Sequence, residues 1–301
     1  MRIVFAGNPE PAVTTLAALK ENHTIVAVVT SEQKPQGRGR KQNKSPVAQY
    51  ALEHMLPLIE TPNINKDARL EQLEYDVGVV VAFGQMIGKT LLAKTRWMNV
   101  HYSLLPRWRG ASPVQHALMY GDDVTGVTTF FLESELDAGP ILAQATYVPS
   151  VQETGTSLMR ELTDIGADLA LQSLQVMEQG IASATGQAQE ITYAPKLTQD
   201  DCRIEWSQSA VAIERRVRAL FEKPTAFTTF RSKRLQLGPM VLAAESIEGQ
   251  AGSIVELDDE IYVCTGSAPL RLGIVKPEGK SWMQAIAWWR GVQNKQNERF
   301  A

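Results

Sequence analysis

Two polar side chains on one short segment, and a third further along the chain, could together stabilise an oxyanion and move a proton. Asn99 and His101 are separated by one residue, and Asp137 follows in the segment Leu-Asp-Ala-Gly. An amide and an imidazole can donate hydrogen bonds to an oxygen that gains negative charge, and a carboxylate can orient the imidazole or accept a proton. Such a site needs neither a metal nor a covalent nucleophile. Taken singly, His101 also fits a structural histidine, and Asp137 a turn aspartate.

The surrounding sequence predicts the sheet that would position these residues. Short runs rich in Val and Ile alternate with segments of helical pattern, which is typical of buried parallel strands in an α/β, doubly wound and mostly parallel sheet. The expected strands are Arg2–Ala6, Thr24–Val29, Asp76–Phe83, Met98–Tyr102 and Val127–Leu132, and the expected helices are Glu10–Lys20, Pro46–His54, Gln85–Ala93 and Thr156–Glu178. Asn99 and His101 then point to one face of a strand, at the carboxyl end where such sheets bind ligands.

A different pattern follows the long helix and predicts a second domain. Residues 180–201 are polar and rich in small side chains, as a linker would be. After a short helix at Ser209–Phe221 come short strands with no helix between most of them, which favours a small antiparallel OB-like β-barrel. These strands are Thr228–Arg231, Arg234–Leu237, Met240–Ala243, Gly252–Val255, Ile261–Cys264 and Leu270–Ile274. We expect a catalytic domain over residues 1–188, a linker over 189–206 and the OB-like domain over 207–301.

Composition and absent motifs exclude several classes of function. The two cysteines, Cys202 and Cys264, are far apart and lack metal-binding spacing, so no disulfide framework and no metal site is expected. No signal peptide and no apolar run long enough to cross a membrane is recognisable, which predicts a cytoplasmic protein. The first strand ends in Gly-Asn-Pro without the glycine pattern of a dinucleotide site, and no P-loop occurs elsewhere. Within an otherwise acidic first part, residues 34–44 form a basic cluster that suits phosphate contacts or a solvated loop.

The motifs and their order resemble a known family. The segment Asn99-Val-His101-Tyr-Ser103-Leu-Leu-Pro106, followed by Leu-Asp137-Ala-Gly, is similar to the signature of the folate-dependent formyltransferases. Within that family, five further segments resemble the methionyl-tRNA formyltransferases, and the resemblance runs over essentially the whole chain. These segments are Phe5–Pro9, Gly37–Lys41, Arg107–Gln115, Tyr193–Lys196 and Pro277–Lys280.

The resemblance implies an activity and a set of residues. It implies formyl transfer from 10-formyltetrahydrofolate to the α-amine of methionine on initiator methionyl-tRNA, by a monomer without a metal. Asn99, His101 and Asp137 occupy the catalytic positions of the family. The positions expected to line the folate site are Ser103, Leu104, Leu105, Pro106, Val81, Phe83 and Gly84, with Leu105-Pro106 a candidate cis peptide. The positions expected to contact tRNA are Arg38, Arg40 and Lys41 in a loop, and Arg215 and Arg218 on a helix, for which a solvated helix face is the alternative.

Two other functions would keep some of these features. A glycinamide ribonucleotide formyltransferase shares the catalytic residues, but it resembles a single domain with a glycine-rich phosphate loop after the first strand, where this chain has Gly-Asn-Pro-Glu-Pro. A catalytically silent RNA-binding protein would not need all three polar residues. The chain departs from the family pattern at Tyr102, a bulky residue at a small position, at Ala138 and Pro140, and over Ala219–Pro224.

Overall fold

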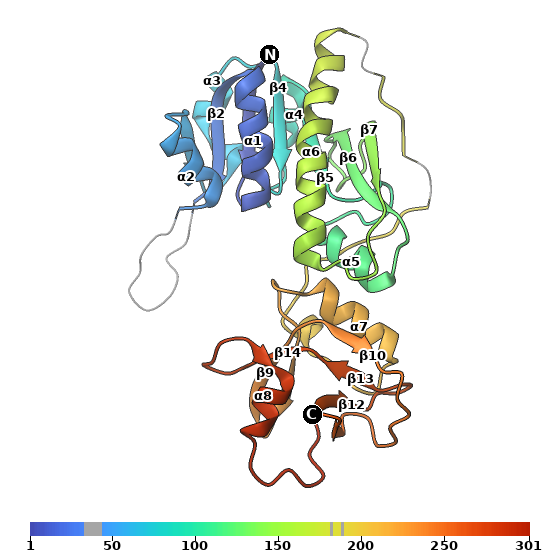
Figure 1. Ribbon diagram of the computed structural model, residues 1–301. Helices are drawn as coiled ribbons and strands as arrows, with labels where there is room; N and C mark the ends of the chain where they lie inside the picture. The colour runs from blue at the N-terminus through green and yellow to red at the C-terminus, as the bar shows by residue number, and fades with distance from the viewer. Residues whose placement is uncertain (33–43, 181–182, 188–189) are drawn as a thin grey trace. The chain divides into compact units, whose positions relative to one another are not determined.

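The computed structural model describes residues 1–32, 44–180, 183–187 and 190–301, and these form two compact units (Figure 1). The first unit comprises residues 1–113, 124–148 and 159–195, and the second comprises residues 114–123, 149–158 and 196–301. The boundaries 1–188, 189–206 and 207–301 stay a prediction. No helix in the described part of the chain combines the length and apolar character that crossing a bilayer requires.

Within its described residues, the first unit is built on one seven-stranded sheet with the order β3-β2-β1-β4-β5-β6-β7. The strands from β3 to β5 pair in parallel, whereas β6 runs antiparallel to both β5 and β7. The predicted mostly parallel sheet is therefore confirmed. The strands are β1 (Arg2–Gly7), β2 (Thr24–Ser31), β3 (Leu58–Thr61), β4 (Val77–Val81), β5 (Trp97–His101), β6 (Thr125–Phe131) and β7 (Ile141–Tyr147).

Helices cover both faces of this sheet, as its buried strands require. In Figure 1, α1 lies in front of the N-terminal half of the sheet and α6 in front of β5 and β6. On the opposite face, Val4 and Ala6 of β1 belong to a buried cluster that also contains residues of α3 and α4. The helices are α1 (Glu10–Asn22), α2 (Pro46–Glu53), α3 (Ala68–Gln72), α4 (Lys89–Lys94) and α6 (Gly155–Glu178), with a 3₁₀ turn η1 (Ile64–Lys66).

The predicted helix Gln85–Ala93 is wrong in its first turn, because α4 begins only at Lys89. The side chain of Gln85 accepts a hydrogen bond from the Ile64 amide and donates to Ser31 and Thr61, which holds the chain outside a helix. The segment before α4 therefore stays a loop at the carboxyl end of β4.

A glycine on β4 makes room for the largest fully buried side chain of the core. Gly78 is paired with Trp97 of β5, and the Trp97 indole donates to the Leu91 carbonyl oxygen at 3.3 Å. A Cβ atom on Gly78 would lie 2.1 Å from Cδ2 of Trp97. The approach of β5 to β4 thus depends on this glycine, and β5 carries Asn99 and His101.

Gly78→Ala should lower the free energy of unfolding by about 1–3 kcal/mol, because the added methyl overpacks the indole. Urea unfolding followed by circular dichroism would measure it. Gly186→Ala is the matched control, since a Cβ there meets nothing within 4 Å. Equal unfolding midpoints for the Gly78 variant and the wild type would contradict this packing.

Helix α6 packs closely over the end of β5. At Gly166, a Cβ atom would lie 3.1 Å from Val100 and 3.4 Å from Tyr102, so the helix and strand approach closely here. Tyr102 is buried, and this burial raises the pKa of Tyr102 to about 12. The bulky residue therefore packs against α6.

The raised pKa of Tyr102 predicts a loss of stability in alkali. The unfolded phenol ionises near its ordinary pKa of about 10, whereas the folded one stays neutral to about pH 12, so stability falls as the pH rises between these values. Tyr102→Phe should lessen the fall in unfolding free energy between about pH 10 and about pH 12. An equal fall in both proteins would show that Tyr102 ionises freely in the folded state.

The second unit, all of whose residues are described, contains two four-stranded antiparallel sheets. Their orders are β10-β13-β12-β11 and β15-β14-β9-β8, which agrees with the expected antiparallel β domain. The strands are β8 (Phe227–Phe230), β9 (Lys233–Leu237), β10 (Met240–Leu242), β11 (Ile254–Leu257), β12 (Glu260–Val263), β13 (Leu270–Leu272), β14 (Ile274–Pro277) and β15 (Met283–Gln284). The helices are α5 (Pro113–Tyr120), most of which belongs to this unit, α7 (Ala210–Ala219) and α8 (Ala285–Arg290), with a 3₁₀ turn η2 (Asp200–Cys202).

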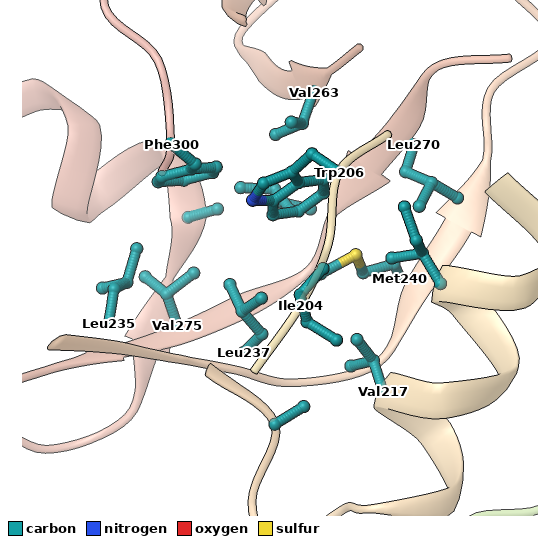
Figure 2. Close-up of a cluster of buried hydrophobic side chains, with 14 of the residues drawn as sticks. Ile204, Trp206, Val217, Leu235, Leu237, Met240, Val263, Leu270, Val275 and Phe300 are labelled. Atoms are coloured by element: carbon teal, nitrogen blue, oxygen red, sulfur yellow. The ribbon is translucent and has the colours of Figure 1, made fainter. Parts of the chain in front are cut away.

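The second unit has a hydrophobic core of its own, shown in Figure 2. Trp206 stacks on Phe300 with 5.2 Å between ring centres, and its indole donates to Thr228 at 2.9 Å. The segment 270–274, expected as one strand, is divided into β13 and β14 at Gly273. A Cβ at Gly273 would lie 2.7 Å from the Pro239 carbonyl oxygen, so the chain can pass from one sheet to the other only with a glycine here.

Candidate active site

A pocket of about 420 Å³ in the first unit brings Asn99, His101 and Asp137 together. Asn99 and His101 come from β5, and Asp137 comes from the loop between β6 and β7. The other residues that line the pocket are Val80, Ala82, Phe83, Gly84, Gln85, Met86, Ile87, Val100, Tyr102, Gly110, Ala111, Pro113, Leu132, Glu133, Glu135 and Leu136. The pocket therefore opens at the carboxyl ends of β4 and β5, where ligands of such sheets bind.

The His101 ring is held by its neighbours on three sides. Its Nε2 lies 2.8 Å from the carbonyl oxygen of Trp108, which can only accept, so Nε2–H is the donor. Its Nδ1 lies 3.9 Å from Oδ2 of Asp137, which is longer than a hydrogen bond. The Phe130 ring is perpendicular to the imidazole, with 6.4 Å between ring centres. Nδ1 is thus the ring atom that remains for a substrate.

Asp137, whose carboxylate lies in the pocket near His101, has an unusual backbone conformation. Asp137 has a φ of +48° in the left-handed region, and its side chain is largely buried. Its Oδ2 accepts a hydrogen bond of 2.8 Å from the Gly110 amide. The loop after β5 and the loop after β6 are therefore joined through the carboxylate itself.

The residues predicted to line a folate site divide into two groups. Phe83 and Gly84 line the pocket, and Val81 lies between the lining residues Val80 and Ala82. The structure does not bring Ser103, Leu104, Leu105 or Pro106 into the pocket wall. Their predicted folate contact stays a prediction.

The turn formed by residues 103–106 is fixed instead by β6 and β7. Ser103 Oγ donates to the Arg107 carbonyl oxygen at 2.6 Å, and the Thr128 hydroxyl donates to the Ser103 carbonyl oxygen at 2.7 Å. The Leu105 amide donates to Thr128, and Gln144 donates to the Leu105 carbonyl oxygen. The predicted cis peptide at Leu105-Pro106 is confirmed. This turn shapes the chain that carries Trp108 and Gly110.

Sequence reasoning missed the apolar walls of the pocket. Met86, Ile87, Leu132 and Leu136 line it, from the loops after β4 and β6. For Met86 and Ile87 the available signal was their position, since they follow β4 at the ligand-binding edge of the sheet. Leu132 and Leu136 gave no such signal, because β6 runs antiparallel to β5 and ends beside the amino end of that strand. Within the described residues, no group of three His, Cys, Asp or Glu side chains could hold a metal ion.

The predicted tRNA contacts are placed only in part. Arg38, Arg40 and Lys41 lie outside the described residues. On α7, Arg215 donates to the Tyr120 carbonyl oxygen at 3.1 Å. The Arg218 side chain is 11% exposed and pairs with Glu214 at 2.7 Å, and it also donates to the Glu153 carbonyl oxygen. Arg218 therefore stabilises the second unit, and a phosphate contact by either arginine stays a prediction.

Comparison with known families and proteins finds similarity over almost the whole length of the chain. Residues 1–174 match the formyl transferase family, and residues 196–293 match the formyl transferase C-terminal domain. The methionyl-tRNA formyltransferase of Thermobifida fusca is 40% identical over 307 residues, covering 100% of this chain and 99% of that protein. The methionyl-tRNA formyltransferase of Saccharopolyspora erythraea is 42% identical over 314 residues, covering 99% of each.

Solved structures share the fold at lower sequence identity. HypX from Aquifex aeolicus in complex with tetrahydrofolic acid has a TM-score of 0.67 at 21% identity, covering 97% of this chain and 47% of that one. An N-formyltransferase from Helicobacter canadensis in complex with folinic acid and dTDP-3-aminofucose has a TM-score of 0.69 at 17% identity, covering 90% and 98%. The matches to both domains, with the full-length identity, place the chain in the formyltransferase family, among the methionyl-tRNA formyltransferases.

Proposed function

We propose that the protein transfers the formyl group of 10-formyltetrahydrofolate to the α-amine of methionine on initiator methionyl-tRNA, giving N-formylmethionyl-tRNA for translation initiation. The observation that carries the proposal is the single pocket lined by Asn99, His101 and Asp137, in a chain of this family. As the family resemblance implies, the enzyme acts as a monomer in the cytoplasm.

The pocket fits the flat heteroaromatic ring of a folate. Its volume of about 420 Å³ lies within the range of small-molecule sites, and side chains such as Phe83, Ile87 and Leu132 give it apolar walls. The backbone turns irregularly at Ala82 and Gly84, both with positive φ, so peptide groups there can serve a ligand rather than a neighbouring strand. Bound here, 10-formyltetrahydrofolate supplies an activated formyl group.

The three polar side chains have separate tasks in the transfer. The Asn99 amide donates a hydrogen bond to the formyl oxygen, which gains negative charge as the methionine amine attacks the formyl carbon. A doubly protonated His101 donates to the same oxygen through Nδ1, because its Nε2–H is engaged by Trp108. Asp137, 3.9 Å from Nδ1, orients and stabilises the charged ring and helps to accept the amine proton, directly or through water. The tetrahedral intermediate then collapses: the bond between the formyl carbon and N10 of the folate breaks, and the proton taken from the amine is delivered to N10, so that tetrahydrofolate leaves.

The tRNA would be held outside this pocket by basic residues. Arg38, Arg40 and Lys41 belong to a segment that resembles the tRNA-binding loop of the family, and residues 202–301 carry more basic than acidic side chains. Arginine and lysine side chains in such positions bind phosphates and draw the tRNA toward the enzyme.

Asn99→Ala and His101→Ala should each lower kcat by about 10²–10³-fold, because each removes one donor to the formyl oxygen. The measurement is steady-state formylation of methionyl-tRNA with 10-formyltetrahydrofolate, and Asn22→Ala on the exposed end of α1 is the control. Wild-type rates in both variants would refute the proposed roles.

The acceptor is tested with the wild-type enzyme. Methionyl-tRNA should be formylated and glycinamide ribonucleotide should not, because the Gly-Asn-Pro turn after β1 lacks the glycine-rich loop that would bind a phosphate. Preference for the ribonucleotide, or no formylation of tRNA, would overturn the proposed function.

Arg38→Ala should raise the KM for tRNA several-fold and leave the KM for the folate unchanged, because one phosphate contact is lost while the pocket stays intact. Lys66→Ala, which removes the same charge from an exposed position of the first unit, is the matched control. A tRNA KM equal to that of the wild type would exclude Arg38 from tRNA recognition.

A further inference from the structure

A single glutamine outside the pocket, Gln187, bridges the loop after β5 and the loop after β6, two of the loops that line the pocket. Gln187 Nε2 donates to the carbonyl oxygens of Asp137 and Gly139, at 2.8 Å and 2.9 Å. Its Oε1 accepts from the Arg109 guanidinium, at 3.1 Å from Nε and 2.7 Å from Nη2. One side-chain amide therefore uses both of its ends, each for two hydrogen bonds.

The Asp137 loop needs such support because its backbone is strained. A positive φ at an aspartate is disfavoured and persists only where surrounding contacts enforce it. At Gly139, a Cβ atom would lie 1.8 Å from the Phe131 carbonyl oxygen, so the loop is pressed against the end of β6. The carbonyl groups of Asp137 and Gly139 converge on the NH₂ group of Gln187. Without Gln187, the loop loses two of the hydrogen bonds that hold its backbone in this strained conformation.

The oxygen of the Gln187 amide accepts hydrogen bonds from a buried charged group, the Arg109 guanidinium. The Arg109 side chain is 4% exposed, and its ion-pair partner Glu135 is 68% exposed, so water weakens that pair. Gln187, which is only partly exposed, gives the guanidinium a second acceptor. Gly110, the residue next to Arg109, donates its amide to the Asp137 carboxylate. The contacts thus close a ring from Gln187 through Arg109 and Gly110 to Asp137.

The segment that carries Gln187 is anchored on both sides. Thr185 and Ile141 exchange two backbone hydrogen bonds, of 2.8 Å and 2.9 Å. Further along, the Arg109 amide donates to the Thr192 carbonyl oxygen, and the Arg109 carbonyl oxygen accepts from Ala194. The polar stretch expected as a linker is therefore tied, at these positions, to the loops around the pocket.

We propose that Gln187 is a positioning residue for formyl transfer, which holds the Asp137 backbone so that its carboxylate stays between the Gly110 amide and His101. This inference rests on the proposed function. Gln187 does not line the pocket, so it acts through Asp137 and not through contact with a substrate. Its loss should therefore lower kcat, and the KM values for folate and tRNA should stay the same.

The first experiment compares Gln187→Ala and Gln187→Glu with the wild type in steady-state formylation of methionyl-tRNA. We expect kcat to fall by about 10- to 100-fold in both variants, because displacement of a catalytic group by about 1 Å can cost 10²-fold. The glutamate keeps an acceptor for Arg109 but cannot donate to the two carbonyl groups. Wild-type kcat in Gln187→Glu would mean that Gln187 serves only as a hydrogen-bond acceptor for Arg109, which would overturn the proposal.

Controls separate positioning from folding and from the proposed function. Gln175→Ala, at an exposed position of α6, should match the wild type. Gln187→Glu is nearly isosteric, so it keeps the test valid if the alanine variant fails to fold. A wild-type enzyme without formylation activity would refute the proposed function itself, whereas an active wild type with an equally active Gln187→Ala would refute only the positioning role.

A double-mutant cycle gives a readout that a merely structural role would not produce. If Gln187 acts through Asp137, Gln187→Ala should change kcat by less than about twofold in an Asp137→Asn background, since coupled residues are not additive. If the two losses in kcat multiply, Gln187 acts independently of the carboxylate and the proposal is wrong.

Discussion

The hydrogen bond of 2.8 Å between the Gly110 amide and the Asp137 carboxylate is the contact on which the pocket depends. It joins loops that follow two different strands and brings the carboxylate to 3.9 Å from His101. Asp137 makes it with a backbone that costs free energy at any residue except glycine. The contacts around the loop, with Gln187 and against the end of β6, are what make that backbone stable.

The sheet provides the rigid part of the site, and the loops provide the adjustable part. Asn99 and His101 lie on β5, which pairs with β4 on one side and β6 on the other, so their spacing is fixed by two strand ladders. Gly78 allows β5 to approach β4, and Gly166 allows α6 to cover the end of β5. The second unit has its own core of buried side chains, so it can keep its fold without contributing to this pocket.

Much of this could be predicted from the sequence, because it depends on local periodicity. Alternating apolar runs predicted the mostly parallel sheet, and the two-residue spacing predicted that Asn99 and His101 share a face. Contacts between distant residues could not be predicted in this way. No local pattern indicated that the Gln85 side chain would form hydrogen bonds that keep the residues before α4 out of the helix. Nor did a local pattern indicate that residues 103–106 would form hydrogen bonds with β6 and β7, or that Gln187 would donate to the Asp137 carbonyl oxygen. Such hydrogen bonds depend on tertiary placement, which residue type and spacing do not encode.

The most direct measurement is the single-turnover rate of formyl transfer by Asp137→Asn, by rapid quench with saturating folate and methionyl-tRNA. The substitution keeps the size of the side chain but removes its charge and its ability to accept a proton. If the carboxylate stabilises His101 and helps to remove the amine proton, the rate should fall by at least about 10²-fold. A rate equal to that of the wild type would contradict the catalytic role of the Asp137 carboxylate, and with it the account of how the pocket is held together for catalysis.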